Sequence, residues 1–225
     1  MVTRPELDEL VLGLQDRLDL FQGTRRKLNL YLANEFNVFL QYFDPDENAI
    51  SRVLAILLDP EGVHGQGAVF LDQFLDMIGH PELCAVSGKA RVRYQDPATW
   101  ANGSGLIDIT IDMGKFGVGI ENKPWAGEQK DQVPRYLEHL RKRYAGFCLV
   151  FIDGRGCPPK SISIHEQQAL DADGRFKMIS YHRELKHWVD ACARTSEADK
   201  IRWFLRDFAS YIERRFVPLE AEGDN

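Results

Sequence analysis

Two neighbouring runs of alternating apolar residues carry charged side chains at positions where a plain surface strand would not need them. Asp108 and Asp112 lie within the first run, GLIDITIDM, and Glu121 and Lys123 end the second, FGVGIENK. Carboxylate oxygens are the donors that hard divalent cations prefer in proteins. These residue types therefore suit a metal site, provided that folding brings the two runs together.

A tight hairpin would bring them together. If Gly114 and Lys115 form a two-residue turn, with glycine first as type II′ turns prefer, Asp108 lies directly opposite Glu121. Cross-strand Cβ atoms are then roughly 5 Å apart, close enough for two carboxylates to share a cation, whereas opposed like charges alone are destabilising.

The two faces of this hairpin differ in character. One face is almost entirely apolar and would cover a core, whereas the other gathers the acids and Lys123 beside Gly117 and Gly119, which are expected to leave room above the sheet. A solvated outer face of an antiparallel hairpin explains part of the same pattern. Spacing alone leaves both interpretations open.

The rest of the chain predicts an α/β protein. Apolar spacing favours two helices within residues 5–43, separated by Gly23, and the order from Asp44 onward is helix, helix, three strands, helix, strand. This order indicates a mixed sheet flanked by helices. We expect three segments: an N-terminal helical extension (1–43), a core (44–180) and C-terminal helices packed on the core (181–225). The acidic tail 219–225 is expected to fray.

Composition excludes several classes. The 44% hydrophobic and 28% charged content is typical of a soluble globular chain, and no apolar run is long enough to span a bilayer. The four cysteines lack paired zinc spacing and indicate a reduced, cytoplasmic setting. The net charge of −6 argues against a broadly basic nucleic-acid coat but allows a local basic groove.

Together these features resemble the PD-(D/E)xK nuclease superfamily, whose members have the restriction-endonuclease-like fold. The motif consists of an aspartate, an ExK triplet ending the next strand, and a QxxxY pair on the following helix: Asp108, Glu121, Asn122, Lys123, Gln132 and Tyr136. The upstream block ENAISRVLAILLDPEGVHGQGAVFLDQFL is similar to the N-terminal half of a bacterial stand-alone branch, so the resemblance covers about residues 40–153. One departure is Ile107, which stands where the motif has proline, a position that varies within the superfamily.

The resemblance implies a metal-dependent phosphodiesterase site. Asp108 and Glu121 would hold Mg²⁺, or Mn²⁺ in its place, and the Asn122 carbonyl would complete part of the shell. Lys123 would orient and help deprotonate the attacking water and stabilise the charged phosphorane. The simpler alternative for Lys123 is an ion pair with Glu121, and both can hold in the resting protein.

Gln132 and Tyr136 share one helical face because they are four residues apart. In the QxxxY subset of the superfamily these residues touch the nucleophile, the lysine or the DNA. The alternative is a partly exposed first turn. Pro134 is tolerable only within the first turn, so the helix is expected to begin near Lys130 or Asp131.

Glu47 and His64 each have two explanations. Asp44 can be an N-cap with Pro45 first and Glu47 third in the helix, a capping-box arrangement. The resemblance instead implies that Glu47 is the acid that reaches the metal, directly or through water. His64 matches the family block at a position of unknown role and is a secondary candidate, because a lone loop histidine is more often structural.

Basic and aromatic residues near the motif are candidates for gripping nucleic acid. On the preceding strand and the following helix they are Arg91, Arg93, Arg135, Arg141 and Lys142, with Arg143 beside them and Arg25, Arg26 and Lys27 farther upstream. Any one such cluster is usually a solvated face, whereas several around an acidic pocket favour binding. Trp125 and Trp100 can stack on bases or act as lids on the core.

The sequence therefore predicts a divalent-metal-dependent nuclease that hydrolyses phosphodiester bonds by a one-step attack of water. The expected substrate is DNA. Roles in restriction, anti-phage defence or repair follow from family analogy alone. A non-catalytic binding or scaffold module is disfavoured by the intact Asp108, Glu121 and Lys123 set. An RNA-directed toxin nuclease keeps the chemistry and changes the substrate. The long terminal helices could support a homodimer.

Overall fold

The structure, a computed structural model, describes residues 4–33, 36–125 and 127–216; the acidic tail lies outside these residues. Its centre is a five-stranded sheet in the order β1-β2-β3-β4-β5. The strands are β1 (Arg91–Trp100), β2 (Gly103–Asp112), β3 (Phe116–Lys123), β4 (Gly146–Asp153) and β5 (Phe176–Ser180). The first three are antiparallel and the last two run parallel to β3, which confirms the predicted mixed sheet.

The hairpin has the predicted register. Met113 donates its backbone N–H to the Phe116 carbonyl at 3.0 Å, and Gly114 has φ +80°, a value that glycine adopts without strain. The ladder between β2 and β3 runs from Asp112–Gly117 to Ile109–Ile120 and ends there. Asp108 is therefore the first residue of β2 beyond the pairing with β3, and the expected Asp108–Glu121 pair is not part of the ladder.

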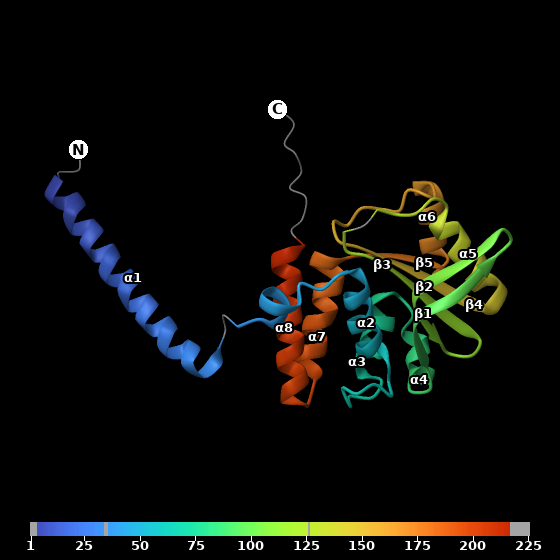
Figure 1. Ribbon diagram of the computed structural model, residues 1–225, viewed down its shortest axis with the longest axis horizontal. Helices are drawn as coiled ribbons and strands as arrows, with labels where there is room; N and C mark the ends of the chain where they lie inside the picture. Colours follow the sequence, from blue (N-terminus) through green and yellow to red (C-terminus); the bar gives the residue numbers. More distant parts are fainter. Residues whose placement is uncertain (1–3, 34–35, 126, 217–225) are drawn as a thin grey trace.

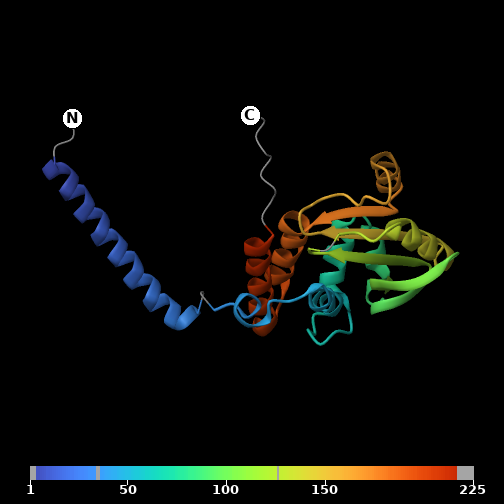
Figure 2. The same ribbon diagram turned by 45° about the horizontal axis from the view of Figure 1, so that its top comes forward.

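Helices cover both faces of the sheet (Figures 1 and 2). On one face lies α5 (Gln132–Arg143); on the other lie α2 (Glu47–Leu58), α3 (Val69–Met77), α7 (Lys186–Thr195) and α8 (Asp199–Arg215). Alternate residues of β4 divide between the two cores: Cys148 and Val150 face the larger helical layer, and Leu149 and Phe151 face α5. Burial on both faces explains why this strand is continuously apolar.

The expectation that Gly117 and Gly119 leave room above the sheet is wrong. A Cβ atom at Gly117 would lie 2.2 Å from the Tyr144 ring, and one at Gly119 would lie 2.9 Å from Leu140. Helix α5 and the residue after it therefore fill this space, and the glycines allow the close approach of a helix to the sheet. Ile107 likewise joins the α5-side core instead of the core that holds Ile109.

The N-terminal region also differs from the prediction. A single helix, α1 (Arg4–Leu32), runs through Gly23, where a break was expected. An interior glycine costs only about 1 kcal/mol relative to alanine, and the leucines and basic residues around it are good helix formers. Helix α1 projects away from the sheet and its helices (Figure 1). The second helix expected after Gly23 is divided: its first residues continue α1 to Leu32, and its end forms the short π-helix η1 (Phe39–Phe43).

Smaller elements complete the fold. The predicted order did not include η2 (Pro81–Leu83), α4 (Cys84–Ser87) and α6 (Ile164–Ala172), and a π-helix, η3 (Tyr181–Leu185), leads into α7. Among the described helices, none combines the length and apolar character needed to cross a membrane.

Candidate active site

The start of α2 sets the position of Glu47. Asp46 is the N-cap, and its side chain accepts a hydrogen bond from the Ala49 backbone N–H at 2.7 Å. The predicted cap at Asp44 is therefore wrong by two residues, and Glu47 is the first helical residue instead of the third. Since Asp46 satisfies the helix terminus, the capping-box explanation of Glu47 no longer applies.

Lys123 lies between two carboxylates. Its Nζ is 2.6 Å from Glu121 Oε1 and 2.8 Å from Glu47 Oε1, and its side chain is only 7% exposed. Lys123 thus forms the ion pair with Glu121 that was predicted as its simpler role. Glu47 adds a second partner from α2, so strand β3 and helix α2 together fix the ammonium.

Asp108 and Asn122 are joined through the backbone. Asp108 Oδ2 accepts the Asn122 N–H at 2.8 Å. The Asn122 side chain points the other way: its Nδ2 donates to Ser51 Oγ at 2.9 Å, and its Oδ1 accepts the Tyr181 hydroxyl. With both side-chain groups used, what Asn122 can offer an ion is its backbone carbonyl, as the resemblance implied.

Gln132 links α5 to the acids. Its Oε1 accepts the Gln129 N–H at 3.0 Å, and its Nε2 donates to Glu121 Oε1 at 2.6 Å and to the Tyr136 hydroxyl at 3.2 Å. Tyr136 in turn donates to the Leu106 carbonyl at 2.6 Å. Gln132 and Tyr136 are both buried, so the alternative of a partly exposed first turn is wrong. Helix α5 begins at Gln132 after an N-cap at Asp131, one residue beyond the predicted start.

The electrostatics of the cluster favour an added positive charge. Burial raises the pKa of Glu121 to about 8, and the charge of Asp108 acts in the same direction. Burial also raises the pKa of Asp108. Burial opposes the charge of Lys123, but Glu121 and Glu47 outweigh it and raise the pKa of this lysine. Three carboxyl groups against one ammonium leave an excess of negative charge that a proton or a cation can neutralise.

One oxygen in this cluster has no partner. Glu121 Oε2 is buried and accepts no hydrogen bond from any described residue, whereas Oε1 has two donors. A buried carboxylate oxygen without a donor is costly, and such an orphan requires an explanation. A hard divalent cation shared with Asp108 would satisfy it.

The set of donors suits magnesium better than zinc. Across the described part of the chain, no three histidine, cysteine, aspartate or glutamate side chains form a ready cluster of ligands. Mg²⁺ is commonly bound by one or two carboxylates and keeps several waters, so Asp108 and Glu121 fit it without a third acidic, histidine or cysteine side chain. Zinc, in contrast, usually takes three or four protein ligands that include histidine nitrogen or cysteine sulfur.

The comparison with protein families shows which family the chain belongs to. The family model described as the PD-(D/E)XK nuclease superfamily matches residues 33–210, which is most of the chain. The chain belongs to the PD-(D/E)XK nuclease superfamily. This confirms the family inferred from the motif, and the mixed sheet flanked by helices is consistent with its restriction-endonuclease-like fold. Neither the curated proteins nor the solved structures contain a significant match to this PD-(D/E)XK chain.

Several basic residues predicted to grip nucleic acid are held by neighbouring acids. Arg93 lies 3.5 Å from Asp112, and Arg143 lies 2.7 Å from Asp96. Lys142 pairs with Glu138 one turn earlier on α5. Arg91 and Arg141 are exposed and form no ion pair with any described residue. The nucleic-acid contacts of all these residues stay predictions.

The aromatic candidates have structural contacts of their own. Arg135 lies over the Trp100 ring at 4.8 Å and donates to the Asp131 carbonyl, so Trp100 covers the start of α5. Trp125 stacks on Phe216 with ring centroids 5.6 Å apart, yet it remains 45% exposed. Of the two tryptophans, Trp125 therefore keeps more surface available for a ligand.

His64 is accounted for by its loop. Its Nε2 lies 2.8 Å from the Asp59 carbonyl, its Nδ1 accepts the Gln66 N–H at 3.0 Å, and its ring packs against Phe70. These contacts close the turn between α2 and α3. None of them joins His64 to the acids around Lys123, so a site role for it stays an untested secondary prediction.

Sequence reasoning missed two residues that support the site. Ser51 and Tyr181 anchor the Asn122 side chain from opposite sides. Ser51 could have been found, because it lies four residues after Glu47 and so on the same face of α2. Tyr181 could not, because it is 59 residues from Asn122 in the chain.

Proposed function

We propose that this chain is a divalent-metal-dependent nuclease that hydrolyses phosphodiester bonds in DNA. Membership of the superfamily supports a nuclease function in general. The observation that carries the metal-dependent step is the orphaned Glu121 Oε2 within a buried, negatively charged cluster that also contains Asp108. Water attacks phosphorus, one P–O bond of the diester breaks, and the leaving oxygen takes a proton.

The protein's own groups have distinct roles in this proposal. Asp108, Glu121 and the Asn122 carbonyl would hold Mg²⁺ or Mn²⁺, which lowers the pKa of water and neutralises phosphoryl oxygens when bound. Because the pKa of Lys123 is raised, this side chain stays protonated at neutral pH. Lys123 therefore acts by donating hydrogen bonds to the water or the phosphate, and we assign it charge stabilisation in preference to proton abstraction.

Glu47 and Gln132 hold the reacting groups in place. Glu47 reaches Lys123 from α2, and Gln132 reaches Glu121 from α5. The family resemblance implies a further role for Glu47, as an acid that would reach the cation directly or through water. Tyr136 is committed to the Leu106 carbonyl, and burial raises its pKa to about 12, so it positions Gln132 and does not exchange a proton.

The wider setting is proposed from analogy and from the cysteines. All four cysteines are free thiols, as in a reducing cytoplasm. Restriction, anti-phage defence and repair are the roles that family analogy offers. The exposed Arg91, Arg141 and Trp125 would contact the nucleic acid, and a homodimer would present two such sites.

A cleavage assay tests the proposal. Purified protein is incubated with circular DNA, linear DNA and single-stranded RNA, each with Mg²⁺, Mn²⁺ or EDTA, and Asp108→Ala serves as the inactive control. We expect metal-dependent cleavage of DNA that the variant lacks. Cleavage of RNA but not of DNA would show that the substrate is RNA. Cleavage unaffected by EDTA or by Asp108→Ala would refute the proposed site. Binding without cleavage of any substrate would favour a non-catalytic module.

A further inference from the structure

Helix α1 carries an uncovered apolar surface. It lies outside the segment that matches the nuclease family and extends away from the sheet and its helices in both views (Figures 1 and 2). Large apolar side chains on it remain 44% to 63% exposed, namely Val11, Leu14, Leu18, Phe21 and Leu28. Exposed apolar patches of this kind mark interaction sites in soluble proteins.

The spacing of these residues indicates the kind of partner. Counting from Val11, steps of three and four residues alternate through Leu14, Leu18, Phe21, Arg25 and Leu28. This 3–4 alternation is the a/d seam of a heptad repeat, which is covered by a second helix with the same repeat. At 29 residues, α1 is about 43 Å long, enough for four heptads.

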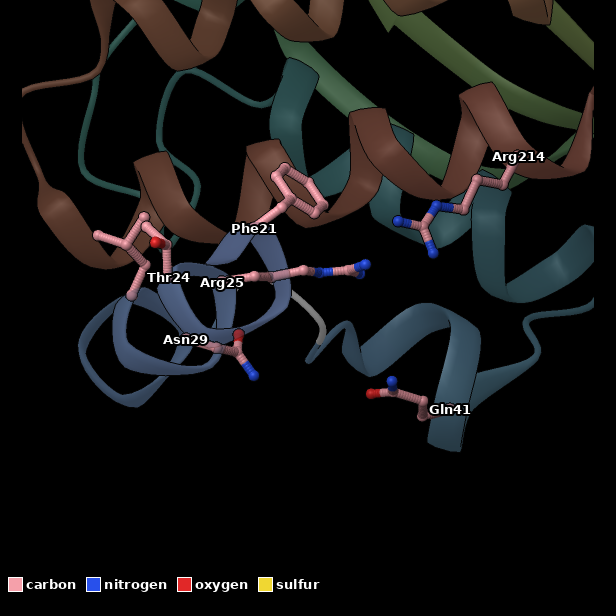
Figure 3. A pocket seen from close by; sticks show the side chains of 7 residues that line it. Phe21, Thr24, Arg25, Asn29, Gln41 and Arg214 are labelled. Carbon is pink, nitrogen blue, oxygen red and sulfur yellow. The ribbon is translucent and has the colours of Figure 1, made fainter. Parts of the chain in front are cut away.

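The body of the protein does not offer a matching surface. An open hollow of about 610 Å³ lies beside the C-terminal half of α1 (Figure 3). Its lining from α1 includes Phe21, Arg25 and Leu28, whereas its lining from the rest of the protein is Gln41 and Arg214. Polar side chains opposite an apolar seam do not bury it, so the partner that suits the seam is another helix.

We propose that α1 pairs with α1 of a second copy of this chain as an antiparallel coiled coil. In an antiparallel pair each a position faces a d position, so Leu18 opposes Phe21 of the partner subunit and Val11 opposes Leu28 of the partner subunit. The seam is therefore complementary to itself. Apolar layers form at its centre and at both ends.

Arg25 selects the antiparallel direction. In a parallel pair, Arg25 would face its own copy inside the seam, and two buried like charges repel. In the antiparallel pair it faces Leu14 of the partner subunit, so its alkyl stem can pack against that leucine without opposing a like charge. Of the two directions, the antiparallel one avoids a charge conflict.

The flanking positions agree with this direction. Beside the central layers, Gln15 lies opposite Gln22 of the partner subunit, and Arg17 lies opposite Thr24 of the partner subunit. Neither pair opposes like charges, and both consist of side chains that can hydrogen-bond at a solvated edge.

Two leucines on α1 provide a matched test. Leu18 lies on the seam and Leu20 lies off it, and both are exposed, at 54% and 73%. Molar mass by light scattering and sedimentation across a concentration series would measure self-association of the full chain. We expect the wild type to dimerise, Leu18→Glu to weaken the dimer by about 100-fold or more because a charge enters two layers, and Leu20→Glu to leave it within about threefold.

The result that overturns the proposal is equally specific. A wild-type chain that stays monomeric at about 100 µM, or equal loss of association in Leu18→Glu and Leu20→Glu, would mean that the seam is not a dimer interface. The melting temperatures of both variants should equal that of the wild type, which would show that both variants are folded.

A distance measurement tests the direction. With Cys84→Ser and Cys157→Ser removing the more accessible thiols, a spin label is attached at Leu30→Cys, which lies off the seam. In the antiparallel pair the two labels are offset by 21 residues, about 32 Å along the axis; in a parallel pair they are level and within about 20 Å across it. A distance above about 30 Å supports the antiparallel pair, and one below about 20 Å overturns it.

Discussion

Gln132 Nε2 lies 2.6 Å from Glu121 Oε1, and the other oxygen of the same carboxylate has no donor among the described residues. Helix α5 thus fixes the plane of the carboxylate through one oxygen and leaves the second for something outside the chain. The hydrogen bond from the Gln129 backbone to Gln132 Oε1 fixes which end of the amide faces Glu121. Helix α5 therefore determines how the proposed metal ligand Glu121 is presented.

Removal of Gln132 tests this relationship. We expect Gln132→Ala to lower Mn²⁺ affinity and turnover by about 10- to 100-fold, because a ligand without its orienting partner loses preorganisation. Titration calorimetry with Mn²⁺ and cleavage rates would measure both. Gln168→Ala, on the exposed face of α6, is the matched control and should leave both unchanged. Wild-type Mn²⁺ affinity in Gln132→Ala would show that the hydrogen bond does not orient the ligand.

Glu47 and Asp46 should separate function from stability. Asp46 caps α2, so Asp46→Ala should cost about 0.5–2 kcal/mol of unfolding free energy and leave turnover nearly intact. Glu47 contacts Lys123 and does not cap the helix, so Glu47→Gln should fold normally and lose turnover by a factor of about 10² or more. Chemical denaturation and cleavage rates for the two variants give the comparison. Wild-type turnover in Glu47→Gln would reduce Glu47 to a surface residue of α2.

Lys123 should promote catalysis and weaken metal binding. We expect Lys123→Ala to lose most activity, because the charge that stabilises the attacked phosphate is gone. Mn²⁺ affinity should stay the same or rise, since the removed ammonium lies 2.6 Å from Glu121 and competes with the ion. Calorimetry on the variant measures this directly. Activity near that of the wild type would transfer the role to another residue, and weaker Mn²⁺ binding would contradict the competition.

The pKa of Glu121 gives a pH dependence with a definite sign. In the folded metal-free protein this pKa is about 8, against 4.5 ordinarily, so between these values the folded state binds more protons than the unfolded state. Stability should therefore fall as pH rises through this window, by at most about 1.4 kcal/mol per pH unit for this one group. The raised pKa of Asp108 lowers stability with rising pH in the same way, at the acidic end of this pH window.

Denaturation in EDTA from pH 5.5 to 8.5 would measure this slope. Glu121→Gln has no proton to lose at this position and should show a flatter profile than the wild type. Mn²⁺ should bind the wild type more tightly as pH rises, because the cation and the proton compete for one carboxylate. Parallel profiles for the wild type and Glu121→Gln would place the ionisation elsewhere.

Local patterns predicted those features that depend on neighbouring residues. The alternation around Gly114 predicted the hairpin and its register, because turn type and side-chain period fix the pairing of adjacent strands. Glu47, Gln132 and Tyr136 were candidates because they match positions of the family's motif, and their roles in the site stay predictions. The hydrogen bonds that Glu47 and Gln132 make to Lys123 and Glu121 form because α2 and α5 both pack beside the end of β3.

Features set by packing were not predictable. Gly117 and Gly119 looked like space for a ligand, since nothing in the sequence shows that Tyr144 and Leu140 fill it. The Asn122–Tyr181 contact depends on how η3 folds back over β3. The helix cap at Asp46 was missed because Asp44-Pro45 and Asp46 are both acceptable starts, and tertiary contacts decide between them.

Because the ammonium of Lys123 lies between Glu121 and Glu47, the metal-free protein carries an internal counter-ion. We therefore expect this chain to fold without the ion, unlike small zinc domains, in which the metal supplies the folding energy. On the proposed function, the folded metal-free protein would be inert until an ion binds. Chelation should silence such an enzyme reversibly, with the fold kept for the next ion.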